Sequence, residues 1–354
     1  MNAEITPPRA GRVLIVRLSS IGDVVHALPG FHHLRKAMPE AFIGWAVEQA
    51  AAPLLRGVEG LDRVHEIPVQ EWRRRPLAPR TWGNIRSLRR ELREGRYDVA
   101  ADFQGLWKSA LVARASGART IGLATADLRE PGARRLYDRQ VAAGEPGEHV
   151  TRRGLRLAAA ICNSPADGTT WPAIRPPATD APDETADSAL PPILLHTAAN
   201  WDSKRYPDER WVEVGTALHE QTARQVLWVW GPGEGDRVAA LAKQAGRGNA
   251  PTARADLVTF AAMCRGAALL VGGDSAPLHI AVACGTPVVG LFGPTDPERL
   301  GPVSARDGVV LRKLECSHCH RRVCPLGTRE CLESIGSDEI VAAAIARLAE
   351  EQGA

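Results

Sequence analysis

The chain opens with a short apolar run that leads into a polar turn. Val13 to Val16 are β-branched or leucine residues, a pattern typical of a buried strand in a parallel sheet. Ser19 and Ser20 then offer helix N-caps, and an apolar stripe with helical spacing begins at Val24. We therefore expect a strand, a tight turn and a helix between Arg12 and Pro29.

The same alternation of strand and helix continues through the first half of the chain. The pattern predicts strands at 13–16, 42–47, 63–67 and 97–102, and helices up to Lys36, after Gln49, in an arginine-rich segment ending by Gly95, and from about Leu106. Repeated βα units indicate a parallel sheet covered by helices on both faces. Residues 1–162 are therefore expected to form one Rossmann-like domain.

A second βα series follows a change in composition. Residues 163–192 are rich in Pro, Ala, Asp and Thr, which is typical of an interdomain linker. Beyond it the pattern predicts strands at 193–196, 226–230, 269–271 and 288–292, and helices near 208–220, 235–245, 259–264 and 276–284. We expect an α/β protein in which a second Rossmann-like domain with a parallel sheet, 193–336, faces the first. An amphipathic helix in 337–354 could pack on either domain.

Composition places the chain among globular proteins. Its 354 residues are 44% hydrophobic and 24% charged, with a net charge of +3, and no apolar run is long enough to span a membrane. The N-terminus lacks the basic flank and apolar core of a secretory signal. We expect a cytoplasmic monomer.

Much of the positive charge is arginine and is clustered. One group lies between Arg73 and Arg96, and another between Arg129 and Arg139. The planar arginine fork suits phosphate and carboxylate, although solvated helix faces also carry such runs. Aromatic residues make up only 5% of the chain and no nucleic-acid-binding motif is present, so we expect no nucleic-acid partner.

Asp23 is the first candidate for chemistry. It lies in the turn that follows the first strand, and ligands of open α/β sheets bind at the carboxyl ends of strands. Asp23 could therefore act on a bound substrate. It could equally be an acid of a helix first turn that complements the helix dipole.

Three glycine-containing loops follow predicted strands of the second half. They are 231–235, 272–279 and 293–296, and each also carries polar side chains. Glycine lets a backbone approach a ligand closely, and a helix beginning near Ser275 would point free N–H groups at a phosphate. Lys204, just beyond the strand at 193–196, could reach the same phosphates or lie on the surface. These loops favour a nucleotide-diphosphate site, while the absence of GxGxxG and Walker A sequences argues against a nicotinamide or P-loop enzyme.

Several motifs resemble a known family. RVLIVRLSSIGDVVHALP, DFQGLWKSAL, REPGARRLYDR, GGDSAPLHIAVACGTPVVGLFGPTDP and the linker are similar to the ADP-heptose:lipopolysaccharide heptosyltransferases of glycosyltransferase family 9, and the opening motif, the WRRR segment and DFQGLWKSA most resemble heptosyltransferase I. The resemblance runs from about Arg12 to Leu300. It implies a GT-B fold and metal-independent, inverting transfer of heptose from ADP-L-glycero-D-manno-heptose. The acceptor would be the Kdo region of the lipopolysaccharide inner core, bound by the N-terminal domain, with the protein peripheral on the inner face of the inner membrane.

The resemblance also implies roles for individual residues. Asp23 corresponds to the proposed catalytic base, Lys204 to the donor-phosphate lysine and Glu234 to the carboxylate that contacts the ribose. The remaining donor-binding candidates are Gly273, Asp274, Ser275 and His279, and the acceptor-binding candidates are Ser20, Gly22, Arg73, Arg74, Arg75, Gln104, Arg129, Arg134 and Arg135. The segment HTAAN departs from the paired threonines typical of heptosyltransferase I, which leaves the donor contacts of that loop open.

The chemistry of the transfer needs a group that takes the proton of the acceptor hydroxyl as the anomeric carbon leaves ADP. A carboxylate within hydrogen-bond reach can do this. A helix N-terminus would keep Asp23 ionised and thereby weaken it as a base, so it could instead orient the hydroxyl and stabilise developing positive charge.

Four cysteines form a separate cluster, C-x2-C-x4-C-x6-C, at Cys316, Cys319, Cys324 and Cys331. In a cytoplasmic protein this spacing favours free thiols or a structural metal over local disulfides. This cluster resembles the cysteine clusters of heptosyltransferase II-like members. No cofactor is expected for catalysis. The spacing of these cysteines also suits a structural metal.

Three enzymatic functions remain in competition, besides a non-catalytic sugar-nucleotide binding module, in which Asp23 would have no purpose. The first is the heptosyltransferase I-like transfer, and the second is a heptosyltransferase II-like or other family 9 transfer. A sugar-nucleotide epimerase of the same architecture is the third, but it would not need the anionic acceptor that the arginine clusters suit.

Overall fold

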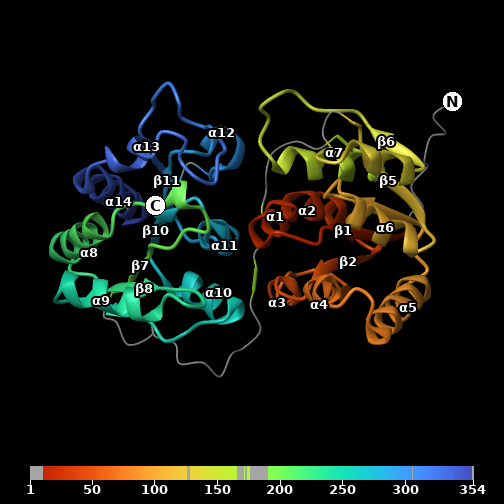
Figure 1. Cartoon of the computed structure of the whole chain (residues 1–354), viewed down its shortest axis with the longest axis horizontal. Helices are drawn as coiled ribbons and strands as arrows, with labels where there is room; N and C mark the ends of the chain where they lie inside the picture. The colour runs from red at the N-terminus through yellow and green to blue at the C-terminus, as the bar shows by residue number, and fades with distance from the viewer. Residues whose placement is uncertain are drawn as a thin grey trace. The chain divides into compact units, whose positions relative to one another are not determined.

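The computed structural model describes residues 11–125, 128–165, 171, 174–175, 190–304 and 306–352. The chain divides into two compact units, Met1–Ile174 and Arg175–Ala354, which Figure 1 colours from red to yellow-green and from green to blue. Residues 1–10 and most of the Pro-rich segment 163–192 lie outside the described residues.

The first unit is built on a six-stranded parallel sheet with the strand order β3-β2-β1-β4-β5-β6. Its strands are β1 (Arg12–Val16), β2 (Phe42–Glu48), β3 (Arg63–Ile67), β4 (Val99–Asp102), β5 (Arg119–Leu123) and β6 (Arg139–Val141). The four strands predicted from the apolar pattern are confirmed. The pattern missed β5 and β6: β5 (RTIGL) has a weak apolar pattern that contains glycine, and β6 is a polar edge strand of three residues.

Helices cover this sheet, and two of the predicted helices are each divided in two. The helices are α1 (Ile21–His26), α2 (Leu28–Ala37), α3 (Ala52–Arg56), α4 (Val69–Arg74), α5 (Pro79–Glu94), α6 (Trp107–Ala115), the 3-10 helix η2 (Pro131–Leu136) and α7 (Thr151–Cys162). Of these, η2 and α7 were not predicted. The single helix expected up to Lys36 is two helices, since Pro29 lies at the start of α2 and has no N–H to continue α1. Pro76 and Pro79 likewise divide the arginine-rich segment into α4 and α5.

The second unit has an equivalent parallel sheet with the order β12-β11-β10-β7-β8-β9. Its strands are β7 (Ile193–His196), β8 (Val226–Val229), β9 (Asn249–Pro251), β10 (Leu269–Gly273), β11 (Val288–Phe292) and β12 (Gly308–Leu311). Its helices are η3 (Asp202–Lys204), α8 (Asp208–Thr222), α9 (Gly235–Ala245), α10 (Leu257–Gly266), α11 (Ala276–Cys284), α12 (Pro297–Leu300), α13 (Glu330–Glu333) and α14 (Ser337–Gln352). All four predicted strands are confirmed.

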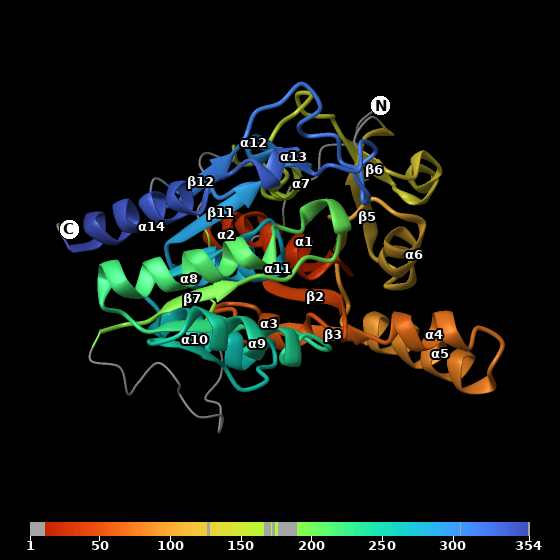
Figure 2. The same ribbon diagram turned by 60° about the vertical axis from the view of Figure 1, so that its left-hand side comes forward.

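The C-terminal helix α14 packs on the second unit. It contacts α8 and β12, and Ile340, Ala344 and Leu348 are buried in the same core cluster as the sheet residues. Figure 2 shows α14 and α8 on one side of this sheet. No helix in the part of the chain that the structure describes is long and apolar enough to cross a membrane.

Candidate active site

Each sheet has one point where the strand order reverses, and some of the predicted site residues, among them Asp23 and Asp274, lie there. In the first unit the chain runs outward from β1 to β3 and then returns to place β4 on the other side of β1. In the second unit the reversal lies between β7 and β10. Because loops diverge at such a point and leave a crevice at the carboxyl ends of the strands, it is the usual ligand site of an open α/β sheet.

In the first unit, Asp23 is held by its neighbours on the β1–α1 turn. Its Oδ2 accepts hydrogen bonds from the backbone N–H and the hydroxyl of Ser20, both at 3.1 Å. Its Oδ1 lies 2.8 Å from Nη2 of Arg17, whose Nη1 also donates to the Phe103 carbonyl at 2.7 Å. The Asp23 side chain nevertheless remains 32% exposed, so its orientation is fixed while a ligand can still reach it.

The loop after β4 completes this arrangement. Gln104 accepts a hydrogen bond from the Leu18 N–H at 2.9 Å and donates to the Ser19 carbonyl at 3.1 Å. Lys108 of α6 donates to the Ser19 hydroxyl at 2.9 Å and to Glu48 Oε1 at 2.8 Å. The structure therefore brings Gln104 onto the Asp23 turn. Sequence reasoning missed Lys108 and Arg17, each a basic residue near a strand end without a distinguishing pattern.

The predicted acceptor arginines lie apart from this turn. Arg73, Arg74 and Arg75 are exposed at the end of α4, while Arg129, Arg134 and Arg135 are exposed in and next to η2. Within the described residues, none of the six makes a hydrogen bond or ion pair with Asp23. Gly22, another predicted acceptor residue, directly precedes Asp23 in α1. A small cavity of about 20 Å³, lined among others by Asp23, Arg17 and Gln104, has room for little more than a water molecule.

In the second unit, Asp274 binds three side chains from different elements: Lys204 of η3, His279 of α11 and Thr295 of the loop after β11. Its Oδ2 accepts hydrogen bonds from Nζ of Lys204 and the hydroxyl of Thr295, both at 2.6 Å, and its Oδ1 lies 3.1 Å from Nε2 of His279. Asp274 is 6% exposed. Burial alone would raise the pKa of Asp274, but the hydrogen bond and charge of His279 and the charge of Lys204 outweigh it and hold the pKa well below its usual range. Thr295 was missed as a site residue, although its loop was predicted.

Ser275 lies beside this network at the start of α11. As the N-cap residue it leaves the first N–H groups of the helix facing away from the helix body. Its hydroxyl is 3.4 Å from Nδ1 of His196, and burial, assisted by the charge of Arg237, lowers the pKa of His196 to about 4. A Cβ on Gly272 would come within 2.9 Å of the His196 carbonyl oxygen, so only glycine fits there. The loops after β7 and β10 are thereby held close together.

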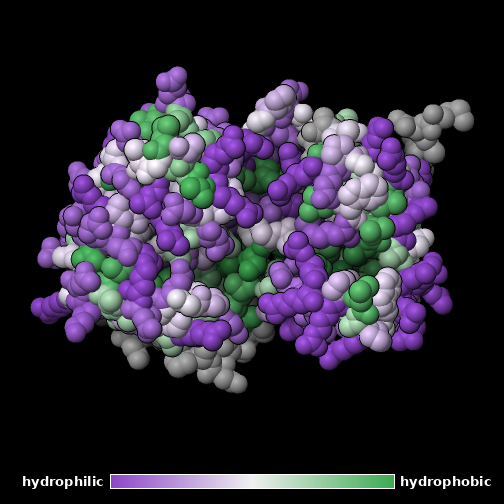
Figure 3. All heavy atoms as spheres, in the orientation of Figure 1, coloured by the Kyte–Doolittle hydropathy of each residue, from purple (hydrophilic) through white to green (hydrophobic). Residues whose placement is uncertain are grey.

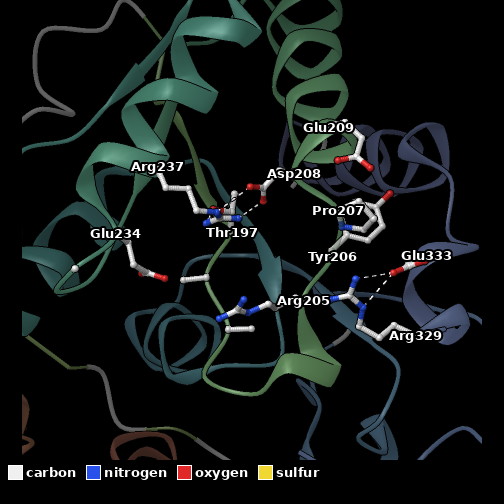
Figure 4. Close-up of a pocket in the computed structure, with 13 residues that line it drawn as sticks. Thr197, Arg205, Tyr206, Pro207, Asp208, Glu209, Glu234, Arg237, Arg329 and Glu333 are labelled. Atoms are coloured by element: carbon white, nitrogen blue, oxygen red, sulfur yellow. Dashed lines mark hydrogen bonds and ion pairs between the residues drawn. The ribbon is translucent and has the colours of Figure 1, made fainter. Parts of the chain in front are cut away.

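A polar pocket of about 570 Å³ lies on the same edge of the second sheet. Figure 4 shows Glu234 at the start of α9 and Arg205 pointing toward the same space, with the Arg237–Asp208 and Arg329–Glu333 ion pairs around it. The Gly231 N–H donates to Glu234 Oε2 at 3.2 Å. Ala198 and Ala199, from the segment that departs from the paired threonines, also line the pocket.

The four clustered cysteines line one small cavity with Pro294 and Leu326. Backbone N–H groups, first that of Arg329, lower the pKa of Cys324, whereas burial raises the pKa of Cys331. Over the ranges that the structure describes, no group of three or more His, Cys, Asp or Glu side chains is arranged to hold a metal ion. The structural metal therefore stays a prediction of the sequence alone.

Comparisons with known proteins agree with this geometry. Residues 85–329 match the model of glycosyltransferase family 9 (heptosyltransferase). Lipopolysaccharide heptosyltransferase 1 of Pseudomonas aeruginosa is 30% identical over 318 residues, which cover 88% of this chain and 87% of that protein. The Escherichia coli enzyme of the same name is 28% identical over 92% of this chain and 99% of its own length.

Solved structures show the same fold. The E. coli heptosyltransferase WaaC with ADP superimposes with a TM-score of 0.78 at 24% identity, over 96% of this chain and 99% of that one. E. coli ADP-heptose lps heptosyltransferase II gives a TM-score of 0.75 at 19% identity, again over 96% and 99% of the two chains. The two six-stranded parallel sheets are those of a GT-B glycosyltransferase. The chain belongs to glycosyltransferase family 9, the heptosyltransferase family.

Proposed function

We propose that this protein transfers heptose from ADP-L-glycero-D-manno-heptose to the Kdo region of the lipopolysaccharide inner core, with inversion and without a metal ion. The observation that carries the proposal is the match to heptosyltransferase 1 proteins over nearly the whole chain. Both halves of the chemistry have candidate residues at the strand-order reversals of the two sheets. The protein would work on the inner face of the inner membrane as a peripheral protein.

On the acceptor side, Asp23 is the proposed base. The acceptor hydroxyl loses its proton to the Asp23 carboxylate while its oxygen forms the bond to the anomeric carbon. Arg17 and Ser20 hold the carboxylate in one orientation. The exposed arginines at 73–75 and at 129–135 suit the carboxylates of Kdo and the phosphates of lipid A.

On the donor side, the bond from the anomeric carbon to the diphosphate breaks and ADP leaves with the electron pair. Lys204 supplies positive charge for the diphosphate, and the free N–H groups at the start of α11 supply hydrogen bonds. Asp274 positions Lys204 rather than meeting the phosphates itself, because it is a buried carboxylate and would repel them. Glu234 is the candidate for the ribose hydroxyls.

The test is a transfer assay read by mass spectrometry. The full chain is incubated with ADP-heptose and a chelator, and with either Kdo-lipid A or heptosyl-Kdo-lipid A as acceptor. We expect one heptose to be added to Kdo-lipid A. Extension of heptosyl-Kdo-lipid A alone would assign the heptosyltransferase II step, which the cysteine cluster favours, and extension of neither acceptor would refute the proposal.

A further inference from the structure

Helix α5 presents an arginine stripe on its outer face. Trp82, Arg86, Arg89 and Arg93 follow one another at intervals of three or four residues, and Arg96 extends the row just beyond the helix end. All five side chains are exposed. The adjoining face carries Thr81, Ile85, Leu88 and Leu92, of which Thr81 and Leu92 are buried against the first unit.

The arginines of this stripe are unpaired. In the described part of the chain, the side chains of Arg86, Arg89, Arg93 and Arg96 make no hydrogen bond or ion pair. Some exposed arginines elsewhere do pair with carboxylates, as Arg114 does with Asp138 at 3.0 Å. The two acids of this part of α5 have other partners, since Glu91 pairs with Arg63 and Glu94 with Arg90. Like charges at helical spacing destabilise a helix, so arginines without an acid partner favour an anionic ligand. The stripe is thus better suited to an anionic partner than to water.

Exposed apolar side chains lie at the beginning of the stripe. Leu77, in the turn between α4 and α5, is 86% exposed, and Trp82 in the first turns of α5 is 50% exposed. Figure 2 shows α4 and α5 at the edge of the first unit, joined by this turn. In Figure 3 the face over α5 is mostly hydrophilic around a small hydrophobic group. We call Leu77, Trp82, Arg86, Arg89, Arg93 and Arg96 the α5 surface.

We propose that the α5 surface docks the protein on an anionic lipid bilayer. The guanidinium groups bind headgroup phosphates through paired hydrogen bonds, while Leu77 and Trp82 insert at the level of the acyl boundary. Arginine together with tryptophan suits this interface because each has an apolar body and a polar or charged end. Single-stranded nucleic acid is less suited, since it needs a series of stacking aromatics and this surface has one.

The inference deepens the proposed function, because it rests on an acceptor that is itself a membrane lipid. Docking through α5 would bring the first unit, which carries Asp23 and the predicted acceptor arginines, to the bilayer that holds the substrate. The α5 surface is distinct from Asp23 and from the predicted acceptor arginines. None of the α5 surface residues contacts Asp23 within the described residues.

The test is vesicle flotation of the full chain. We expect binding to vesicles of phosphatidylethanolamine with phosphatidylglycerol, little binding to phosphatidylcholine alone, and loss of binding at high salt. Each arginine near an anionic surface contributes roughly fivefold. The variant R86Q/R89Q/R93Q/R96Q should therefore bind at least about a hundredfold more weakly. A double variant L77S/W82S should also bind more weakly, with a loss that salt does not change.

A matched control has the same change in net charge on the second unit. K243Q/R247Q/R254Q/R265Q, which changes four exposed residues, should bind vesicles like the wild type. Both this control and the R86Q/R89Q/R93Q/R96Q variant, called the stripe variant, should unfold at close to the wild-type temperature. Equal loss in both quadruple variants would overturn the proposal, because total charge rather than the α5 surface would then be responsible. Binding of the stripe variant at the wild-type level would also overturn the proposal. So would release of the protein from the vesicles by single-stranded RNA at a concentration below that of the anionic lipid.

A second readout separates docking from catalysis. The stripe variant should transfer heptose to a water-soluble, deacylated Kdo acceptor with wild-type kcat and KM, and lose activity only on acceptor embedded in vesicles. If the wild type binds anionic vesicles but transfers to neither acceptor, docking stands and the proposed function fails. If the wild type transfers to both but does not bind the vesicles, docking fails and the proposed function stands.

Discussion

Asp274 joins the loops of the donor side, so its replacement is the sharpest structural perturbation of that half of the site. Asp274→Asn keeps the shape and can still accept the hydrogen bond of Thr295, but it removes the negative charge that faces Lys204 and His279. The side chains of Lys204, His279 and Asp274 are only 16%, 7% and 5% exposed, so solvent screens these interactions little.

The expected loss is large. Removing one partner of a buried ion pair costs about 3–5 kcal/mol, and the retained Thr295 contact favours the lower end. For a unit of this size, residues 175–354, about 3 kcal/mol lowers the melting temperature by roughly 6–12 °C. The Kd for ADP should rise about tenfold or more, because Lys204 loses the group that orients it. Differential scanning calorimetry and titration calorimetry measure the two effects.

The pH dependence distinguishes a charge effect from a packing effect. The pKa of Asp274 is lowered in the folded protein, so its contribution to stability is fully present above the unfolded value of about 4 and is lost as pH falls below it. The difference between wild type and variant should therefore be constant from about pH 6 to 8 and shrink below about pH 4. Glu220→Gln, the same charge change at an exposed position of α8, should cost under about 0.5 kcal/mol.

Two results would refute this reasoning. One is a loss below about 1 kcal/mol for Asp274→Asn at neutral pH, which would mean that the buried charge does not hold the loops. The other is a loss that persists undiminished at low pH, which would show that the amide disturbs packing rather than charge.

Three further predictions concern other parts of the molecule. Asp23→Asn should lower kcat at least roughly a hundredfold with little change in the KM for acceptor, and a loss of only a few-fold would contradict the role as base. The lowered pKa of His196, about 4, means that its stabilising contribution is complete above about pH 6.5 and falls toward pH 4. The wild type should therefore lose about 2 kcal/mol more unfolding free energy between pH 7 and pH 5 than His196→Asn does, as measured by urea unfolding. Equal losses in the two proteins would argue against a buried, neutral His196. Tyr137→Phe removes a 2.7 Å hydrogen bond to the fully buried Asp102 and should cost about 1–3 kcal/mol by thermal unfolding, whereas an unchanged melting temperature would show that water replaces the hydroxyl.

Much of the fold follows from local pattern. Four elements of the second unit, Ile193–His196, Gly235–Ala245, Ala276–Cys284 and Val288–Phe292, have the predicted bounds. They combine strong periodicity with glycine or proline at an end. The strand Asn249–Pro251 was not predicted, because a three-residue polar edge strand is defined by its pairing with β8 rather than by its own residues.

The site was predictable as a set of loops, but its contacts were not. Glycine-rich turns after strands indicate where a ligand approaches, and topology brings such loops to one edge. Arg17, Lys108 and Thr295 act through partners far away in sequence, as in the Lys108–Glu48 and Thr295–Asp274 contacts. Such pairs carry no local signal, so only the folded chain identifies them.

The central claim is heptose transfer to a Kdo acceptor, and acceptor-dependent release of ADP tests it most directly. The full chain is incubated with ADP-heptose in the presence of a chelator, with and without Kdo-lipid A, and ADP and heptosylated lipid are quantified together. The account predicts that the two products appear in equal amounts and that neither appears without acceptor. Release of ADP that does not depend on acceptor, or no heptosylated lipid at all, would contradict it.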